Sequence, residues 1–194
     1  MIGFANQRVE THPLNLMREN PPEGRTMKQG FIIAAAVLLS ACSATAPQTD
    51  NMADAVFLVR HAEKTTQKTD PALTEAGEAR AIALADRLEG EGITHIHSSD
   101  TKRTRDTAAP LAARLDLDVL IYDASDLPAM AAKLQATSGR HLVVGHSNTT
   151  PQLTELLGGD GGTPIVEATE YDRLYVVTTN DGEPVKSYLT RFGE

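Results

Sequence analysis

The chain has 194 residues, of which 41% are hydrophobic and 23% are charged, and its net charge at pH 7 is −8. This composition is typical of a globular domain of modest size and excludes a disordered or fibrous chain. The negative charge, with no tryptophan and only 4% aromatic residues, argues against a protein that binds the phosphate backbone of nucleic acid, so no nucleic-acid partner is expected.

The amino-terminal part of the chain differs from the rest. Residues 1–26 show no sustained periodicity, and we interpret them as an upstream extension before a start at Met27. Residues 27–41 place a lysine, an unbroken apolar run and small residues in the order of a secretory signal peptide. The letters LSAC, which end at Cys42, resemble the lipobox of bacterial lipoproteins, which implies cleavage before this cysteine and lipidation of its sulfur. The alternative is a buried cysteine in a short core helix.

Residues 42–54 are small and polar, which is typical of a flexible tether. Cys42 is the only cysteine, so no intramolecular disulfide can form. We therefore expect an exported protein that a lipid anchor holds to a bacterial membrane, on the periplasmic or cell-envelope side. The folded domain is predicted at 55–194.

Strand and helix signals alternate along this domain. The predicted strands are 55–59, 93–97, 119–122 and 141–145, followed by a hairpin of 174–178 and 185–191. The predicted helices are 75–88 with Thr74 as N-cap, a helix capped by Asp100 that runs to Leu115, 127–135 with Asp126 as N-cap, and one that starts near 150. Pro110 should break or kink the second helix. The alternation predicts an α/β three-layer sandwich, with a mostly parallel sheet and an antiparallel edge strand.

Basic side chains follow three of the predicted strands. Arg60 and His61 end the segment VFLVRH, Arg103 follows the second strand, and His146 follows HLVVG. Such charges can simply solubilise loops, but the carboxyl ends of parallel strands share one edge of a sheet, where ligands bind. Two arginines and two histidines would there form a cup for a phosphoryl group, because guanidinium groups match phosphate oxygens and stay charged.

The segments LVRHAEK, SSDTKRTRDTA and VVGHSN, in this order, resemble the signature of the histidine phosphatase superfamily, which has the phosphoglycerate-mutase-like fold. The resemblance covers residues 55–192, roughly the whole domain. It implies a phosphorylated substrate, with His61 as the nucleophile. It also implies that Arg60 and Arg103 bind the phosphate and that His146 is the fourth basic group.

The chemistry of such a site needs no metal and no other cofactor. A neutral imidazole is a competent nucleophile near pH 7, and neighbouring positive charges favour its neutral form. Attack on phosphorus gives a phosphohistidine, which water then hydrolyses. The other basic groups neutralise charge on the equatorial oxygens. We therefore expect a metal-independent hydrolase of phosphomonoesters or phosphoramidates.

The leaving group usually needs a proton. In larger members of the superfamily an acidic residue after the third strand supplies it, and here that segment contains Asp123 and Asp126. Asp123 is the nearer candidate, although it also looks like a turn former and Asp126 like a helix cap. Short phosphohistidine phosphatases of the superfamily lack a clear acid, so the donor is Asp123, Asp126 or no carboxylate.

Other interpretations stay open. A phosphomutase of the same fold would need a capped pocket and further basic groups, for which the chain has little room. A lipoprotein that binds phosphate without catalysis is disfavoured because the four basic residues are intact. His95 and His97 are a possible metal pair, but no further ligands lie at suitable spacing, so we expect no metal. Glu63 is expected to orient the arginines.

Overall fold

The computed structural model describes residues 54–179 and 185–193. The predicted extension, signal peptide and lipidated Cys42 lie outside the described residues and stay predictions, as does the tether apart from Asp54, which begins the first strand. Among the described helices, none is both long and apolar enough to cross a bilayer.

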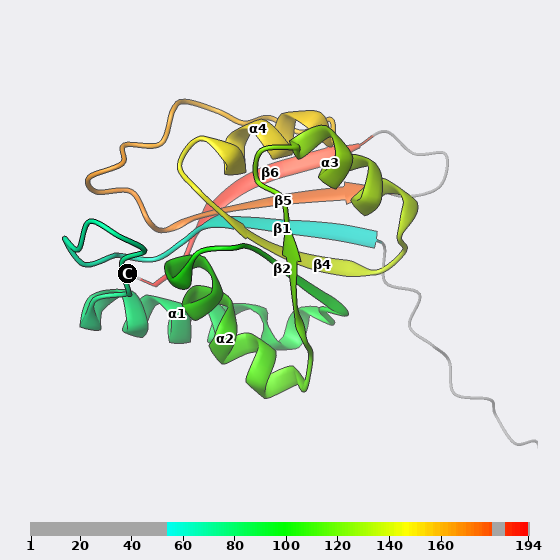
Figure 1. The fold of residues 1–194 in the computed structure, drawn as a ribbon. Coiled ribbons are helices and arrows are strands. Elements are labelled where there is room, and N and C mark those ends of the chain that lie inside the picture. Colours follow the sequence, from blue (N-terminus) through cyan, green and yellow to red (C-terminus); the bar gives the residue numbers. More distant parts are fainter. Residues whose placement is uncertain (1–53, 180–184, 194) are drawn as a thin grey trace, which may run out of the picture. The chain divides into compact units, whose positions relative to one another are not determined.

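The described residues form a six-stranded sheet with helices on both faces (Figure 1). The elements in chain order are β1 (Asp54–Arg60), α1 (Glu75–Leu88), a 3-10 turn (Glu89–Glu91), β2 (His95–Ser99), α2 (Lys102–Leu115), β3 (Val119–Tyr122), α3 (Leu127–Ala136), β4 (Arg140–Gly145), α4 (Thr149–Leu156), β5 (Arg173–Thr179) and β6 (Lys186–Arg191).

The strand order is β3-β2-β4-β1-β5-β6. The first four strands of the chain pair in parallel, whereas β5 is antiparallel to β1 and β6 is antiparallel to β5. Helices α1 and α2 cover one face of the sheet, and α3 and α4 cover the other (Figure 1). The predicted three-layer fold, with its mostly parallel sheet, is confirmed.

The alternation of side chains along β1 explains the two layers of core. Phe57 and Val59 belong to the apolar cluster that contains α1 and α2 residues, whereas Val56 and Leu58 belong to the cluster with α3 and α4 residues. Because β1 lies in the middle of the sheet, all four side chains are buried. Burying a side chain of this kind stabilises the fold by roughly 1.5–3 kcal/mol, so both faces hold the central strand in place.

The helix ends agree in part with the predictions. Thr74 accepts a hydrogen bond from the Gly77 amide at 3.1 Å, and Asp126 accepts one from the Ala129 amide at 3.1 Å, so both predicted N-caps are confirmed. The prediction of Asp100 as a cap is wrong, because α2 starts at Lys102, whose amide donates to the Asp70 carboxylate at 2.8 Å.

Helix α2 continues through Pro110, so of the two outcomes predicted there, a break or a kink, the break is wrong. Proline removes one helical hydrogen bond. On either side of it, however, Ala108 and Leu111 are fully buried in the core, and this packing keeps the helix continuous.

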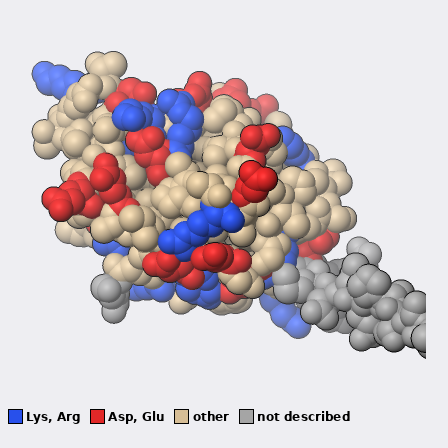
Figure 2. Space-filling model, turned by 90° about the horizontal axis from the view of Figure 1, so that it is seen from below, with Lys and Arg blue, Asp and Glu red and all other residues tan. Residues whose placement is uncertain are grey.

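The face seen from the side of α1 and α2 carries interspersed charges of both signs (Figure 2). Arg114 of α2 pairs with Asp86 of α1 at 2.7 Å, and Lys102 pairs with Asp106 at 3.2 Å. Exposed ion pairs of this kind contribute little stability. Neither sign of charge dominates this face.

Three histidines stack near the amino ends of β2 and β4. The rings of His95 and His141 lie 4.6 Å apart, and His97 lies beside His141. His141 Nε2 donates to the Thr137 carbonyl at 3.0 Å, so its Nδ1 accepts from His97 Nε2 at 3.1 Å. His97 Nδ1 is left buried without a partner. Among the described residues, no group of three or more His, Cys, Asp or Glu side chains is placed to hold a metal ion.

Burial, with smaller contributions from His141, Lys133 and His95, lowers the pKa of His97 from 6.5 to about 3. The unfolded chain therefore binds a proton between these pH values that the folded protein does not bind. Stability due to this group is complete above pH 6.5 and is lost as the pH falls toward 3.

We expect His97→Leu to reduce the acid sensitivity of folding. As the pH falls from 6.5 toward 3, the unfolding free energy of the wild type should decrease more steeply than that of the variant. The difference between the two slopes should be about 1.4 kcal/mol per pH unit. Urea unfolding of the wild type and the variant at a series of pH values between 6 and 4 measures this difference. His61 and His146, which lie at the opposite end of the strands, contribute equally to both proteins, so an equally steep slope in the variant would refute the assignment.

Candidate active site

The four basic side chains predicted from the strand ends converge at the carboxyl edge of the parallel strands. The ring centroids of His61 and His146 lie 5.5 Å apart, with the rings inclined at 68°. Arg103 Nη2 lies 3.4 Å from His146 Nδ1. The positive charges of Arg60 and Arg103 act on both histidines, so the four groups form one cationic cup.

His61 is held by its backbone and by one ring nitrogen. Its amide donates to the Gly145 carbonyl at 2.9 Å, which ties the end of β1 to the end of β4. Its Nδ1 lies 2.7 Å from the Ala62 carbonyl. A carbonyl can only accept, so Nδ1 carries the proton and Nε2 carries the lone pair. Nε2 is thus the ring nitrogen with a free lone pair.

The surroundings of His61 keep its ring neutral. Burial, together with the charges of Arg60, Arg103 and His146, lowers the pKa of His61 to about 3, although the bond to Ala62 opposes this shift. The imidazole is therefore unprotonated at neutral pH, and its Nε2 lone pair is available for attack.

Arg60 is almost completely buried, with 1% of its surface exposed. Its Nη1 donates to the Glu170 carbonyl at 2.9 Å, and its Cζ lies 4.1 Å from the centroid of the Tyr171 ring. The Glu167 carboxylate lies 3.9 Å from Nη2. These three residues were not predicted, because nothing in the sequence links this loop to a strand end more than a hundred residues earlier.

Some donor atoms of the arginines remain unused. Arg60 Nε and Nη2 and Arg103 Nε are buried without a hydrogen-bond partner. An unpaired buried donor is costly, more so on a charged group. Donors of this type match the oxygens of a phosphoryl group, so the cup is built to receive an anion.

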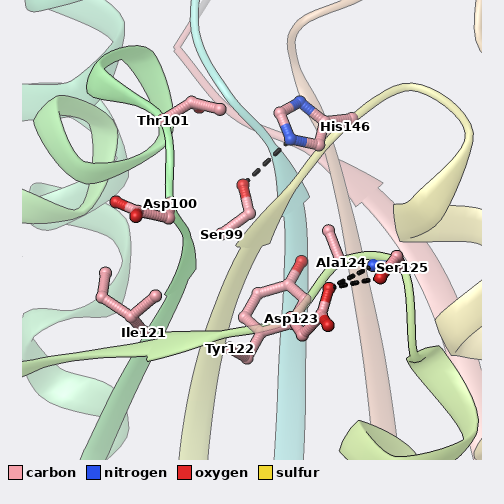
Figure 3. Close-up of a pocket in the computed structure, with 9 residues that line it drawn as sticks. All are labelled: Ser99, Asp100, Thr101, Ile121, Tyr122, Asp123, Ala124, Ser125 and His146. Atoms are coloured by element: carbon pink, nitrogen blue, oxygen red, sulfur yellow. Dashed lines mark hydrogen bonds between the residues drawn. The ribbon is translucent and has the colours of Figure 1, made fainter.

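His146 is fixed by a short chain of hydrogen bonds. Arg103 can only donate, so His146 Nδ1 accepts and His146 Nε2 donates to Ser99 Oγ at 2.9 Å (Figure 3). Ser99 Oγ in turn donates to Thr104 Oγ1 at 3.1 Å. Burial, followed by the charges of Arg103 and Arg60, lowers the pKa of His146 to about 4. A bound phosphate dianion would act in the opposite direction and favour the protonated ring.

A cavity of about 440 Å³ opens beside His146 (Figure 3). It is lined by Ser99, Asp100, Thr101, Ile121, Tyr122, Asp123, Ala124, Ser125 and His146. Several of these residues, including Ile121 and Asp123, are exposed, so the cavity is open to solvent. The connection from β3 to α3 at this point is only residues 123–126, which leaves no room there for a covering insertion.

Asp123 lies in this cavity, as expected from its place after β3. Its Oδ1 accepts from both the amide and the hydroxyl of Ser125, at 2.8 and 2.6 Å (Figure 3). These bonds lower the pKa of Asp123 and favour the ionised form. A general acid must carry a proton at the working pH, so this environment does not favour that role, which stays a prediction.

The other two carboxylates singled out from the sequence lie elsewhere. Asp126 caps α3 and lines a smaller, adjoining cavity next to Lys133, which shares Ile121, Tyr122 and Asp123 with the first. The expectation that Glu63 orients the site arginines is wrong, since its carboxylate binds Arg80 of α1 at 2.8 Å. The close packing of the Glu63 backbone on Gly77, where a Cβ would lie 2.2 Å from the Glu63 carbonyl, directs Glu63 toward that helix.

Comparison with known proteins agrees with this geometry. Residues 56–124 match the model of the histidine phosphatase superfamily (branch 1). Two proteins named probable phosphoglycerate mutase GpmB, from Cronobacter sakazakii and Escherichia fergusonii, are 42% and 44% identical over 73 residues. Each match covers 34% of this chain and 34% of the relative, so the chain spans about a third of the length of the curated relatives it matches.

Solved structures resemble the fold over most of the chain. The mycobacterial glucosyl-3-phosphoglycerate phosphatase has a TM-score of 0.55 and 17% identity, and the match covers 72% of this chain and 98% of that one. The protein histidine phosphatase SixA, complexed with tungstate, has a TM-score of 0.57 and 17% identity, with 71% and 96% covered. Similarity at this level of identity shows the fold alone.

We expect tetrahedral oxyanions to stabilise the folded protein. Tungstate or inorganic phosphate would bind the unpartnered arginine donors, and a ligand at a hundred times its Kd adds about 2.7 kcal/mol to the unfolding free energy. Thermal unfolding with and without tungstate measures the shift. Arg103→Ala should abolish it, whereas Arg114→Ala, at an exposed arginine of the same helix, should preserve it. An equal shift in both variants would place the oxyanion outside the cup.

Proposed function

We propose that the chain is a member of the histidine phosphatase superfamily, whose branch 1 model matches residues 56–124, and that it is a metal-independent phosphatase that hydrolyses phosphomonoesters or phosphoramidates through a phosphohistidine on His61. The His61 ring is neutral with its lone pair on Nε2, and it lies in a cup whose arginines have unused buried donors.

In the first step the Nε2 lone pair of His61 forms a bond to phosphorus while the bond from phosphorus to the leaving oxygen breaks. Arg60, Arg103 and a protonated His146 neutralise the charge on the equatorial oxygens. The leaving oxygen takes its proton from water in the open cavity, or from Asp123 where that group is protonated.

In the second step a water molecule attacks phosphorus and the bond to Nε2 breaks, which returns the lone pair to His61. The proton of the attacking water passes to the base left by the first step, hydroxide or the Asp123 carboxylate, and inorganic phosphate is released. No metal is needed, because the cup itself supplies the positive charge.

The residues of the cavity favour hydrolysis over the mutase reaction. Its lining contains no lysine or arginine, whereas a phosphoglycerate would bring a carboxylate next to the carboxylate of Asp123. The cavity also admits water, which competes for the phosphohistidine. A mutase must instead keep water out and return the phosphoryl group to its substrate.

We expect His61→Ala to abolish hydrolysis of p-nitrophenyl phosphate. The matched control is His95→Ala, which removes a histidine near the opposite end of the strands and should keep wild-type turnover. Steep losses are expected in Arg60→Ala, Arg103→Ala and His146→Ala. Near-normal turnover in His61→Ala would rule out the covalent mechanism. Treatment with EDTA should leave activity intact, and a loss restored by added metal would show that a metal participates.

Asp123→Asn tests whether this side chain acts as the general acid. Loss of a general acid would slow the hydrolysis of alkyl phosphates, which have poor leaving groups, by a factor on the order of 10²–10⁴. The hydrolysis of aryl phosphates would hardly change. Because Ser125 stabilises the carboxylate, we instead expect rates for neutral alkyl and aryl esters to stay within a few-fold of wild type. Steady-state kinetics on both esters measure this. A large loss confined to alkyl esters would establish Asp123 as the acid, and Asp126→Asn is the control for a nearby carboxylate.

We also propose that the chain is exported and anchored by lipid at Cys42. The support is the order in which a lysine, an apolar run, small residues and this cysteine follow one another in the sequence. The mature protein should then begin at Cys42 and carry acyl chains, and Cys42→Ser should prevent both processing and lipid addition without reducing phosphatase activity. Mass spectrometry of protein from bacterial membranes tests this. A mature chain that retains residues 1–41 would refute the proposal.

A further inference from the structure

The cavity beside His146 differs in charge from the cup that it adjoins. The cup is cationic, but the lining of the cavity includes two carboxylates and neither lysine nor arginine. The Asp100 carboxylate pairs with Arg105 and points away from Ser99 and His146 (Figure 3). Asp123 makes no ion pair with any described residue. The unneutralised charge of the cavity is therefore that of Asp123.

The Asp123 carboxylate is fixed but not saturated. Both bonds from Ser125 fall on Oδ1, which leaves Oδ2 with its full capacity to accept hydrogen bonds. The hydroxyls of Ser125 and Thr101 add further acceptor oxygens to the lining. The side chain of Ile121, half exposed, adds an apolar wall. Such a surface suits a short alkyl chain that ends in a cationic hydrogen-bond donor.

The position of a substrate follows from the cup. In the proposed mechanism Arg60 and Arg103, which have buried donors without a partner, bind the phosphoryl group, and His146 belongs to both the cup and the cavity lining. A leaving group on the phosphoryl group therefore has this cavity to enter. We propose that the cavity recognises the leaving group and selects alcohols that carry an ammonium group, so that the preferred substrates are phosphomonoesters of small amino alcohols.

This inference rests on the proposed phosphatase function and adds the substrate class. An ammonium group would meet the Asp123 carboxylate, a neutral alkyl group would meet only Ile121, and a carboxylate would be repelled. Two unit charges about 4 Å apart in water interact strongly enough to change an equilibrium about fivefold. The three kinds of leaving group should therefore be ranked by charge.

The test uses three esters of similar size: 2-aminoethyl phosphate, n-propyl phosphate and 2-carboxyethyl phosphate. We expect kcat/KM of the wild type to be at least about fivefold higher for the aminoethyl ester than for the propyl ester, and about fivefold lower for the carboxyethyl ester. Asp123→Asn should bring the three values close together. Asp118→Asn, which removes an exposed carboxylate outside the cavity, should keep the wild-type ranking.

The outcomes distinguish this inference from the proposed function. If the wild type hydrolyses all three esters at equal rates, the inference is wrong but the phosphatase function stands. The same conclusion follows if Asp123→Asn slows the hydrolysis of all three esters equally. If no ester and no aryl phosphate is hydrolysed, the phosphatase function fails. In that case the melting temperature of His61→Ala, measured with each ester as a ligand, tests the inference through binding. A larger increase with the aminoethyl ester than with the propyl ester would support it, and equal increases would refute it.

Discussion

The site depends on the burial of a guanidinium group at the end of the central strand. Arg60 ends β1, which is packed on both faces, so its side chain has almost no access to water. Burial of a charge is tolerated only with compensation, and here the Glu170 carbonyl, the face of Tyr171 and the Glu167 carboxylate supply part of it. The donors left over are those available to a phosphoryl group.

The protonation state of His61, the proposed nucleophile, depends on burial as well. The His61 ring is itself buried, and it also lies next to the positive charges of Arg60 and Arg103. Each of these favours the neutral ring, and the bond to Ala62 puts the proton on Nδ1. In the proposed mechanism, a single strand end thus provides both a positive charge for the phosphate and a histidine with a free Nε2.

The segment that supports Arg60 is itself anchored by charge. The Glu170 carboxylate binds Arg173 of β5 at 2.8 Å, Arg191 of β6 at 3.1 Å and the Val166 amide at 2.7 Å. The bond from Val166, followed by those from the arginines, lowers the pKa of Glu170 to about 2. The carbonyl of the same residue receives Arg60, so the β5–β6 hairpin holds the loop that partly compensates the buried arginine.

The sequence predicts the parts of the site that depend on strand ends. Arg60, His61 and His146 directly follow or end buried apolar runs, and parallel strands bring such positions to one edge. The Thr74 and Asp126 caps were also predictable, because they are local. The roles of Glu167, Glu170 and Tyr171 could not be predicted, since these residues contact Arg60 through a loop without a periodic pattern. The orientation of Glu63 toward Arg80 depends on the packing of α1, which the spacing of residues does not specify.

In the proposed mechanism, Nε2 of His61 carries the phosphoryl group during turnover. Rapid mixing of the wild-type enzyme with an aryl phosphate, an alkaline quench that preserves phosphohistidine, and mass spectrometry with standards for both ring isomers test it directly. We expect a phosphoenzyme that forms and decays at rates compatible with turnover, labelled at Nε2 of His61. Turnover without any phosphoenzyme, or a label on Nδ1 or on another residue, would contradict it.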